Sequence, residues 1–113
     1  SNLDISNCNI LLNGNSTIDF TSDKLLKTNI KQIENPIDLL KNINGVTFNW
    51  KTDSEKKRDY GVIAQEVEKD IPELVNTYDD RYKKVQYIKF IPILIQCIKN
   101  QQEQIKELQE QIK

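Results

Sequence analysis

The chain contains no histidine, and this absence excludes several common kinds of site. Zinc sites usually combine histidines with closely spaced cysteines, whereas Cys8 and Cys97 lie far apart and form no CxxC pair. A serine nucleophile would have to use a lysine or a carboxylate as its base. We therefore expect neither a metal nor a cofactor. A disulfide between the two cysteines stays open, although a small buried thiol is the commoner outcome.

Long apolar runs and an excess of one charge are lacking too. No stretch reaches the roughly 18 apolar residues of a membrane span, and the start, SNLDIS, lacks the pattern of a signal peptide. Sixteen basic and 17 acidic residues leave a net charge of -1, which would not attract nucleic acid or an anionic membrane. The basic run 56–58 lies between Glu55 and Asp59 and is typical of a solvated hairpin tip. We expect no nucleic-acid and no membrane partner.

Apolar residues are scarce for a compact enzyme. They make up 37% of 113 residues, a length of about one domain, and 29% of the residues are charged. A chain of this size buries only a modest core by itself. The shortage favours self-association as a source of buried surface.

Short strands and short helices are predicted over the first three quarters of the chain. Residues 3–20 indicate two or three strands with a turn at Asn13-Gly14-Asn15, a segment too small to stand alone. Asn35 and Pro36 are typical of a helix start, with Asn35 as the cap. Alternating residues predict one hairpin from 46–50 and 59–64 and another on either side of Asp79-Asp80, with a short helix over 65–70 that Pro72 stops.

From about residue 88 to 113 the pattern changes to a heptad repeat. Isoleucines recur every seven residues, and a second row follows three places later, so the two rows occupy positions a and d of a coiled coil. Pro92 predicts a helix start close to Phe90, or a kink there. The predicted interface residues are Ile91, Leu94, Ile98, Gln101, Ile105, Leu108 and Ile112. Gln101 weakens the packing of its row but can determine register, and the repeat alone leaves the number of strands open.

The stretch TSDKLLKTNI contains Ser22 and, five places later, Lys27. A lysine serves as a base only when neutral, which requires burial or neighbouring positive charge to lower its usual pKa of about 10.4. Neither a regular helix nor a regular strand brings residues five apart together, so a Ser22–Lys27 pair would need a turn or a second subunit. On local chemistry alone, Ser22 is better interpreted as a helix cap.

Four segments together change that interpretation. SDKLLKTNI, GVTFNW, YGVIAQEVEKDIPELV and VQYIKFIPILIQCIKNQQEQIKEL resemble, in this order, the C-terminal intramolecular chaperone auto-processing domain of phage tail fibres, tailspikes and endosialidases, a self-cleaving serine-lysine peptidase family. The likeness covers residues 22–113. Residues 1–21 would then be the end of an upstream β-rich fibre region, and 22–113 the chaperone domain, an α+β fold of small hairpins and short helices followed by a trimeric coiled coil.

The resemblance implies a homotrimer that aligns three chains, folds the upstream fibre and then cuts itself off, acting once on its own chain. Ser22 would be the nucleophile and Lys27 the general base, with the cleavage site beside Ser22, at Ser22-Asp23 by expectation. The hairpins would grip the emerging fibre. The setting would be a viral tail or appendage precursor assembled in the host cytoplasm, with the chaperone released after maturation.

One departure and two alternatives accompany this hypothesis. Leu25 stands where the family pattern leads us to expect a basic residue, which puts the finer geometry of the site in doubt. The first alternative is a structural trimerisation cap that does not cleave. The second is an adaptor that binds a partner through its coiled coil, which leaves the hairpins unexplained.

Overall fold

A computed structural model describes residues 10–12 and 18–112. The chain divides between Gln32 and Ile33 into two compact units. In the first unit, strands β1 (Ile10–Leu12) and β2 (Ile18–Phe20) pair antiparallel, with Ile10 opposite Phe20. Two of the strands expected within residues 3–20 are therefore present, and the predicted turn at 13–15 lies outside the described residues. The functional boundary between residues 21 and 22 stays a prediction.

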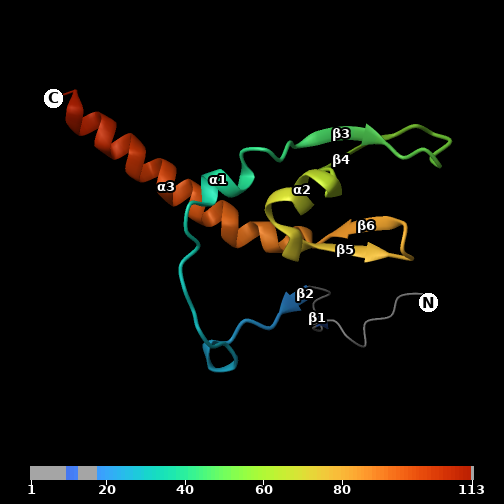
Figure 1. Ribbon diagram of the computed structural model, residues 1–113, viewed down its shortest axis with the longest axis horizontal. Coiled ribbons are helices and arrows are strands. Elements are labelled where there is room, and N and C mark those ends of the chain that lie inside the picture. The colour runs from blue at the N-terminus through green and yellow to red at the C-terminus, as the bar shows by residue number, and fades with distance from the viewer. Residues whose placement is uncertain (1–9, 13–17, 113) are drawn as a thin grey trace. The chain divides into compact units, whose positions relative to one another are not determined.

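The second unit, Ile33–Lys113, contains two antiparallel hairpins. Strand β3 (Val46–Asn49) pairs with β4 (Arg58–Gly61), and β5 (Val75–Tyr78) pairs with β6 (Tyr82–Val85). The loop between the paired residues Tyr78 and Tyr82 has three residues, and its first two, Asp79 and Asp80, both have positive φ, 56° and 54°. Each hairpin is a separate two-stranded sheet. Figure 1 shows both hairpins extending in the same direction from one end of the long helix α3, with α2 between them.

Helices make up the rest of this unit. They are α1 (Pro36–Leu40), α2 (Ala64–Asp70), the 3₁₀ turns η2 (Pro72–Leu74) and η3 (Tyr87–Lys89), and the 22-residue α3 (Phe90–Gln111). Helix α3 starts at Phe90 as predicted, because Pro92 falls in the first turn, where a missing N–H costs no hydrogen bond. An α+β fold with small antiparallel hairpins and a long C-terminal helix is thereby confirmed.

At the start of α1, Asn35 occupies the predicted cap position, but its side chain does not act as a cap. Asn35 precedes Pro36 as expected, but it has left-handed dihedral angles (φ 49°, ψ 51°), and its side chain makes no capping hydrogen bond. The backbone carbonyl of Asn35 instead accepts from the N–H of Leu39 at 3.3 Å. Pro36 itself is buried, so packing determines where this helix begins.

The core of the second unit is small. Only five hydrophobic side chains among the described residues are buried, and they come from α2, from the segment after it and from α3: Val67, Ile71, Leu74, Ile93 and Cys97. Partly buried residues of α1, such as Ile37 and Leu40, pack against this cluster. Cys97 is a free buried thiol, and burial raises its pKa. Cys8 lies outside the described residues.

Tyr87 connects the first hairpin to the base of α3. Its hydroxyl oxygen accepts a 3.1 Å hydrogen bond from the backbone N–H of Val62, at the end of β4. Gly61 makes room for this contact, because a Cβ atom there would lie 2.6 Å from Tyr87 Oη and 3.2 Å from Phe48 Cε1. The glycine is needed for close approach and not for its dihedral angles, since no described glycine has a positive φ.

Replacing Gly61 by alanine should therefore push Tyr87 aside and lower the free energy of unfolding by about 1–2 kcal/mol. Urea denaturation followed by Trp50 fluorescence measures this change. Gly45→Ala is the matched control, because no atom lies within 4 Å of a Cβ at that position. Equal stability of the two variants would show that the contact between Tyr87 and β4 does not contribute to the free energy of unfolding.

Candidate active site at Ser22 and Lys27

The structure brings Ser22 and Lys27 together. Lys27 Nζ donates a 2.7 Å hydrogen bond to Ser22 Oγ. The turn that joins them is the 3₁₀ helix η1 (Lys24–Leu26), in which the N–H of Leu26 bonds to the carbonyl of Asp23 and that of Lys27 to the carbonyl of Lys24. A 3₁₀ turn advances only about 2.0 Å per residue, against about 3.3 Å in a strand, so it shortens the chain between Ser22 and Lys27. This local break from regular geometry lets two side chains five residues apart meet.

Asp23 caps this turn. Its Oδ1 accepts a 2.9 Å hydrogen bond from the backbone N–H of Leu25, and its own backbone is extended. The residue that caps this turn is therefore Asp23, and not Ser22 as local chemistry alone had suggested. Because Asp23 satisfies the free N–H of the turn, the hydroxyl of Ser22 is left to interact with Lys27.

Every residue of this small site is exposed. Ser22, Asp23 and Lys27 all face solvent, and the neighbouring side chains of Leu25 and Leu26 are 90% and 75% exposed. Exposed leucines on a short turn are unusual unless another surface covers them. In the arrangement observed, the lysine donates to the serine. Catalysis would require the reverse, a neutral amine that accepts the hydroxyl proton.

Leu25, the departure from the family pattern, lies on the turn between the two partners. Its backbone N–H bonds to Asp23, and its side chain extends into solvent. The Ser22–Lys27 contact therefore forms without any basic side chain at this position.

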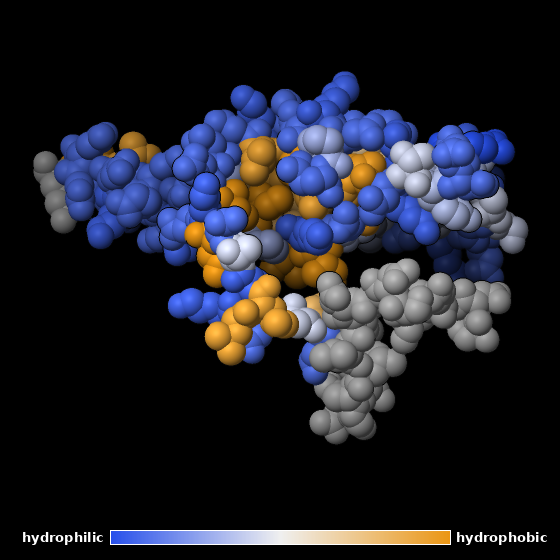
Figure 2. Space-filling view, turned by 60° about the horizontal axis from the view of Figure 1, so that its bottom comes forward, coloured by the Kyte–Doolittle hydropathy of each residue, from blue (hydrophilic) through white to orange (hydrophobic). Residues whose placement is uncertain are grey.

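The predicted interface residues of α3 form one exposed set. Ile91, Leu94, Ile98, Gln101, Ile105 and Leu108 lie on α3, and Ile112 follows its last residue; all seven are exposed. In contrast, Ile93 and Cys97 face the core. The helix thus has two apolar sides, one used within the chain and one left open. In Figure 2, apolar surface gathers on the second unit, where α1 and the first part of α3 lie.

A groove between α1 and α3 continues this open side. It has a volume of about 280 Å³ and is lined by Ile37, Leu40, Lys41, Leu94, Cys97, Ile98 and Gln101. Three of the predicted interface residues therefore border a hollow that α1 helps to form.

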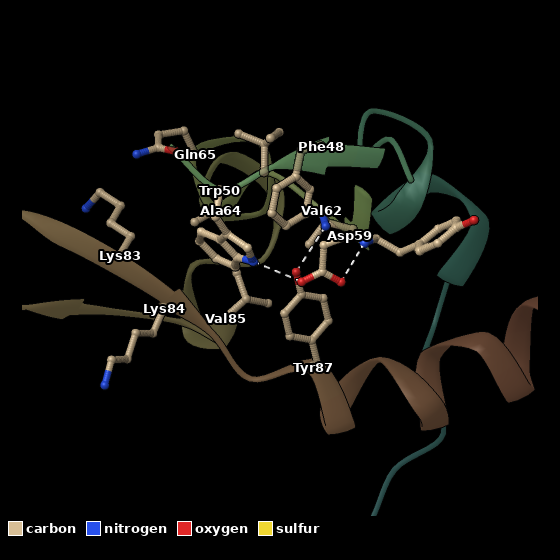
Figure 3. Close-up of a pocket in the computed structure, with 12 residues that line it drawn as sticks. Phe48, Trp50, Asp59, Val62, Ala64, Gln65, Lys83, Lys84, Val85 and Tyr87 are labelled. Atoms are coloured by element: carbon tan, nitrogen blue, oxygen red, sulfur yellow. Dashed lines mark hydrogen bonds between the residues drawn. The ribbon is translucent and has the colours of Figure 1, made fainter. Parts of the chain in front are cut away.

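A larger pocket, of about 690 Å³, lies between the two hairpins (Figure 3). Trp50 packs edge-on against Phe48 at 4.9 Å between ring centroids, and its indole N–H donates to Asp59 Oδ2 at 2.9 Å. This bond, together with the backbone N–H of Tyr60, lowers the pKa of the Asp59 carboxyl. Lys83 and Lys84 come from the opposite hairpin.

Two of the three aromatic side chains of the β3–β4 hairpin are open to solvent. Trp50 is 58% exposed and Tyr60 is 79% exposed, so neither lies in the core of the chain. Alternation of Phe48 and Trp50 along β3 was the signal that both face the same side. No local pattern indicated that a second hairpin would lie across from them.

Within the part of the chain that the structure describes, no group of three or more His, Cys, Asp or Glu side chains could hold a metal ion. Over the same residues, no helix is both long enough and apolar enough to cross a membrane.

Comparison with known proteins supports the resemblance drawn from the sequence. Residues 22–76 match the family model described as the chaperone of endosialidase. The long tail fiber protein Gp37 of Salmonella phage S16 is 33% identical over 105 residues, an alignment that covers 85% of this chain. The chain spans only 14% of that relative's length. No solved structure matches the chain. Residues 22–76 therefore match the endosialidase chaperone family, as the resemblance implied, and the similarity to a tail fibre protein agrees with that match.

Proposed function

We propose that this domain assembles three copies of an upstream phage tail fibre and is then released by autoproteolysis beside Ser22. The family match and the tail-fibre relative support the chaperone role. The observation that carries the proposed release is the 2.7 Å hydrogen bond between Lys27 Nζ and Ser22 Oγ. Aligning three long chains costs conformational entropy, and a shared C-terminal helix bundle would hold the three ends at high effective concentration.

The chemistry of release follows from this pair. Neutral Lys27 takes the hydroxyl proton of Ser22 while Oγ attacks a neighbouring peptide carbonyl carbon. The C–N bond breaks, and the lysine ammonium returns the proton to the departing amine. Water then hydrolyses the resulting ester, which leaves a carboxylate on one fragment and restores the hydroxyl of Ser22.

Ring size restricts which bond each route can cut. Attack of Ser22 Oγ on the carbonyl of Thr21 closes a five-membered ring and cuts Thr21–Ser22. Attack on the carbonyl of Ser22 itself would close a strained four-membered ring. Cleavage at Ser22–Asp23, the bond that the resemblance implies, therefore requires the Ser22 hydroxyl of a second copy. We propose cleavage at Ser22–Asp23 between copies of the assembled trimer, in place of the action on its own chain that the resemblance implied.

Assembly would also supply what the exposed site lacks. Burying Lys27 disfavours its charged form, and Lys24 and Lys31 contribute nearby positive charge along the chain. Leu25 and Leu26 provide apolar surface beside the pair that a neighbouring copy can cover. Cleavage would then follow assembly, and the fibre would stay folded because the device that aligned it is gone.

Both alternative functions would use the exposed face of α3, but neither would use the Ser22–Lys27 pair. A non-cleaving trimerisation cap and a coiled-coil adaptor both use the seven exposed residues. Neither requires a lysine amine held 2.7 Å from a serine hydroxyl. The pair thus favours autoproteolysis over both.

Replacing either member of the pair should abolish cleavage. A longer chain that includes upstream fibre should give two fragments on a denaturing gel, and Ser22→Ala and Lys27→Ala should each give one. Lys51→Ala is the matched control, since it removes an exposed lysine that lies outside the site and makes no hydrogen bond to Ser22, and it should still be cut. An uncut parent would favour the cap, and a cut Lys27→Ala variant would rule out the lysine as the base.

The mass of the fragments identifies the bond and hence the route. We expect a C-terminal fragment that begins at Asp23, which indicates attack between copies. A fragment that begins at Ser22 would instead indicate attack within one chain, on the Thr21 carbonyl, and would overturn the proposed bond. Intact mass spectrometry separates the two outcomes by one serine residue.

Asp23 should act as a positioning residue through its cap on η1. Asp23→Ala removes the acceptor for the N–H of Leu25, costs about 1 kcal/mol of turn stability and should slow cleavage roughly fivefold. Asp23→Asn keeps a capping oxygen and should retain the parent rate. Equal slowing in both variants would mean that the charge beside the scissile bond matters and the cap does not.

A further inference from the structure

We propose that Gln101 selects the parallel, in-register pairing of α3 with second copies of this chain, an inference that rests on the proposed trimer. Gln101 is the one polar residue in the two rows of the exposed face. All residues in row a are isoleucines, and the other two in row d are Leu94 and Leu108. Gln101 lies on α3 near the middle of the seam and is itself exposed in the single chain.

An amide in an apolar seam needs a hydrogen-bonding partner. Burying it without one costs more than any gain from packing the rest of the side chain. When identical helices run parallel and in register, every Gln101 lies in the same layer as the Gln101 of the other copies. Their amides can then donate to and accept from one another, since each carries both an N–H₂ group and a carbonyl oxygen.

Other pairings leave the amide unpaired. A slip by one heptad places Gln101 among Leu94 or Leu108 of a neighbour. In helices that run in opposite directions, row a of one meets row d of the other. At least one Gln101 would then lie among isoleucines only, whatever the overlap. Only the parallel, in-register arrangement gives every Gln101 an amide partner.

Charge does not make this selection. Past Ile98, the positions that flank the seam, e and g, are all glutamine: Gln102, Gln104, Gln109 and Gln111. The charged residues of this half of α3 occupy the outer positions b, c and f: Lys99, Glu103, Lys106, Glu107 and Glu110. In most coiled coils, charges at e and g specify partner and orientation. Here these positions carry no charge, so a second copy meets no like-charge repulsion. The Gln101 layer would therefore determine the specificity.

The consequence for the chaperone is alignment. Three helices slipped by one heptad would offset their chains by about 10 Å, at about 1.5 Å per residue. An upstream fibre that starts from offset chains would pair the wrong strands. A single glutamine layer would thus transmit the correct register from the C-terminal helix to the fibre.

A spin label on Gln111→Cys measures register directly. The background carries Cys8→Ser, while Cys97 is left in place because it is buried and its thiol is poorly ionised. Pulsed electron paramagnetic resonance on the assembled parent should give one short label-to-label distance. Gln101→Leu should keep the oligomer, as judged by sedimentation, but add populations longer by about 10 Å for a heptad slip and up to about 30 Å for antiparallel helices.

Gln104→Leu is the matched control, because it replaces the same residue type at a flanking position of the same helix. It should keep the single short distance. The same single distance in Gln101→Leu would overturn the role of Gln101 while leaving the trimer intact. If the parent is monomeric, the proposed trimer is wrong, and this inference is wrong with it. Because the label lies in α3, none of these outcomes depends on whether Ser22 cuts the chain.

Discussion

One copy of the chain buries little apolar surface, and this shortage constrains the rest of the structure. Five buried hydrophobic side chains hold the second unit together, while a whole side of α3 and much of the aromatic pocket face solvent. Each exposed Leu or Ile lacks the roughly 1.5–3 kcal/mol of stabilisation that full burial of its side chain would give. A chain with this balance is stabilised when copies of it associate. The core therefore holds α1, α2 and both hairpins at the base of α3, and the free face of α3 is where the rest of the burial becomes available.

In the proposed function, the catalytic pair would depend on assembly in the same way. Local geometry brings Lys27 to Ser22, because the 3₁₀ turn capped by Asp23 shortens the path between them. Local geometry does not remove water from the pair. In the proposed function, the two requirements of a lysine base, proximity and a dry environment, would be met by different levels of structure. The single chain would then carry an inactive site until neighbouring copies cover it.

Local patterns predicted most of the elements but not their contacts. The hairpin at Asp79-Asp80 and the start of α3 follow from turn chemistry and from Pro92, which act within a few residues. Asn35 occupies the predicted cap position of α1 without a capping hydrogen bond, and the carboxylate of Asp23 caps η1 where local chemistry had favoured Ser22. The contact of Gly61 with Tyr87 joins residues 26 apart, and the pocket joins two hairpins; neither leaves a short-range trace in the sequence. The Ser22–Lys27 pair needed the resemblance to be singled out, since five-residue spacing alone argues against contact.

The central claim is that cleavage follows assembly, and the dependence of cleavage on protein concentration tests it most directly. A chain with upstream fibre is unfolded, diluted into native buffer over a range of concentrations and sampled over time for the C-terminal fragment, with sedimentation of Ser22→Ala reporting assembly at each concentration. The account predicts that the fragment appears only at concentrations where trimer forms, and at a rate that rises with concentration until trimer formation is complete. Cleavage at the same rate in dilute, monomeric chain would contradict it.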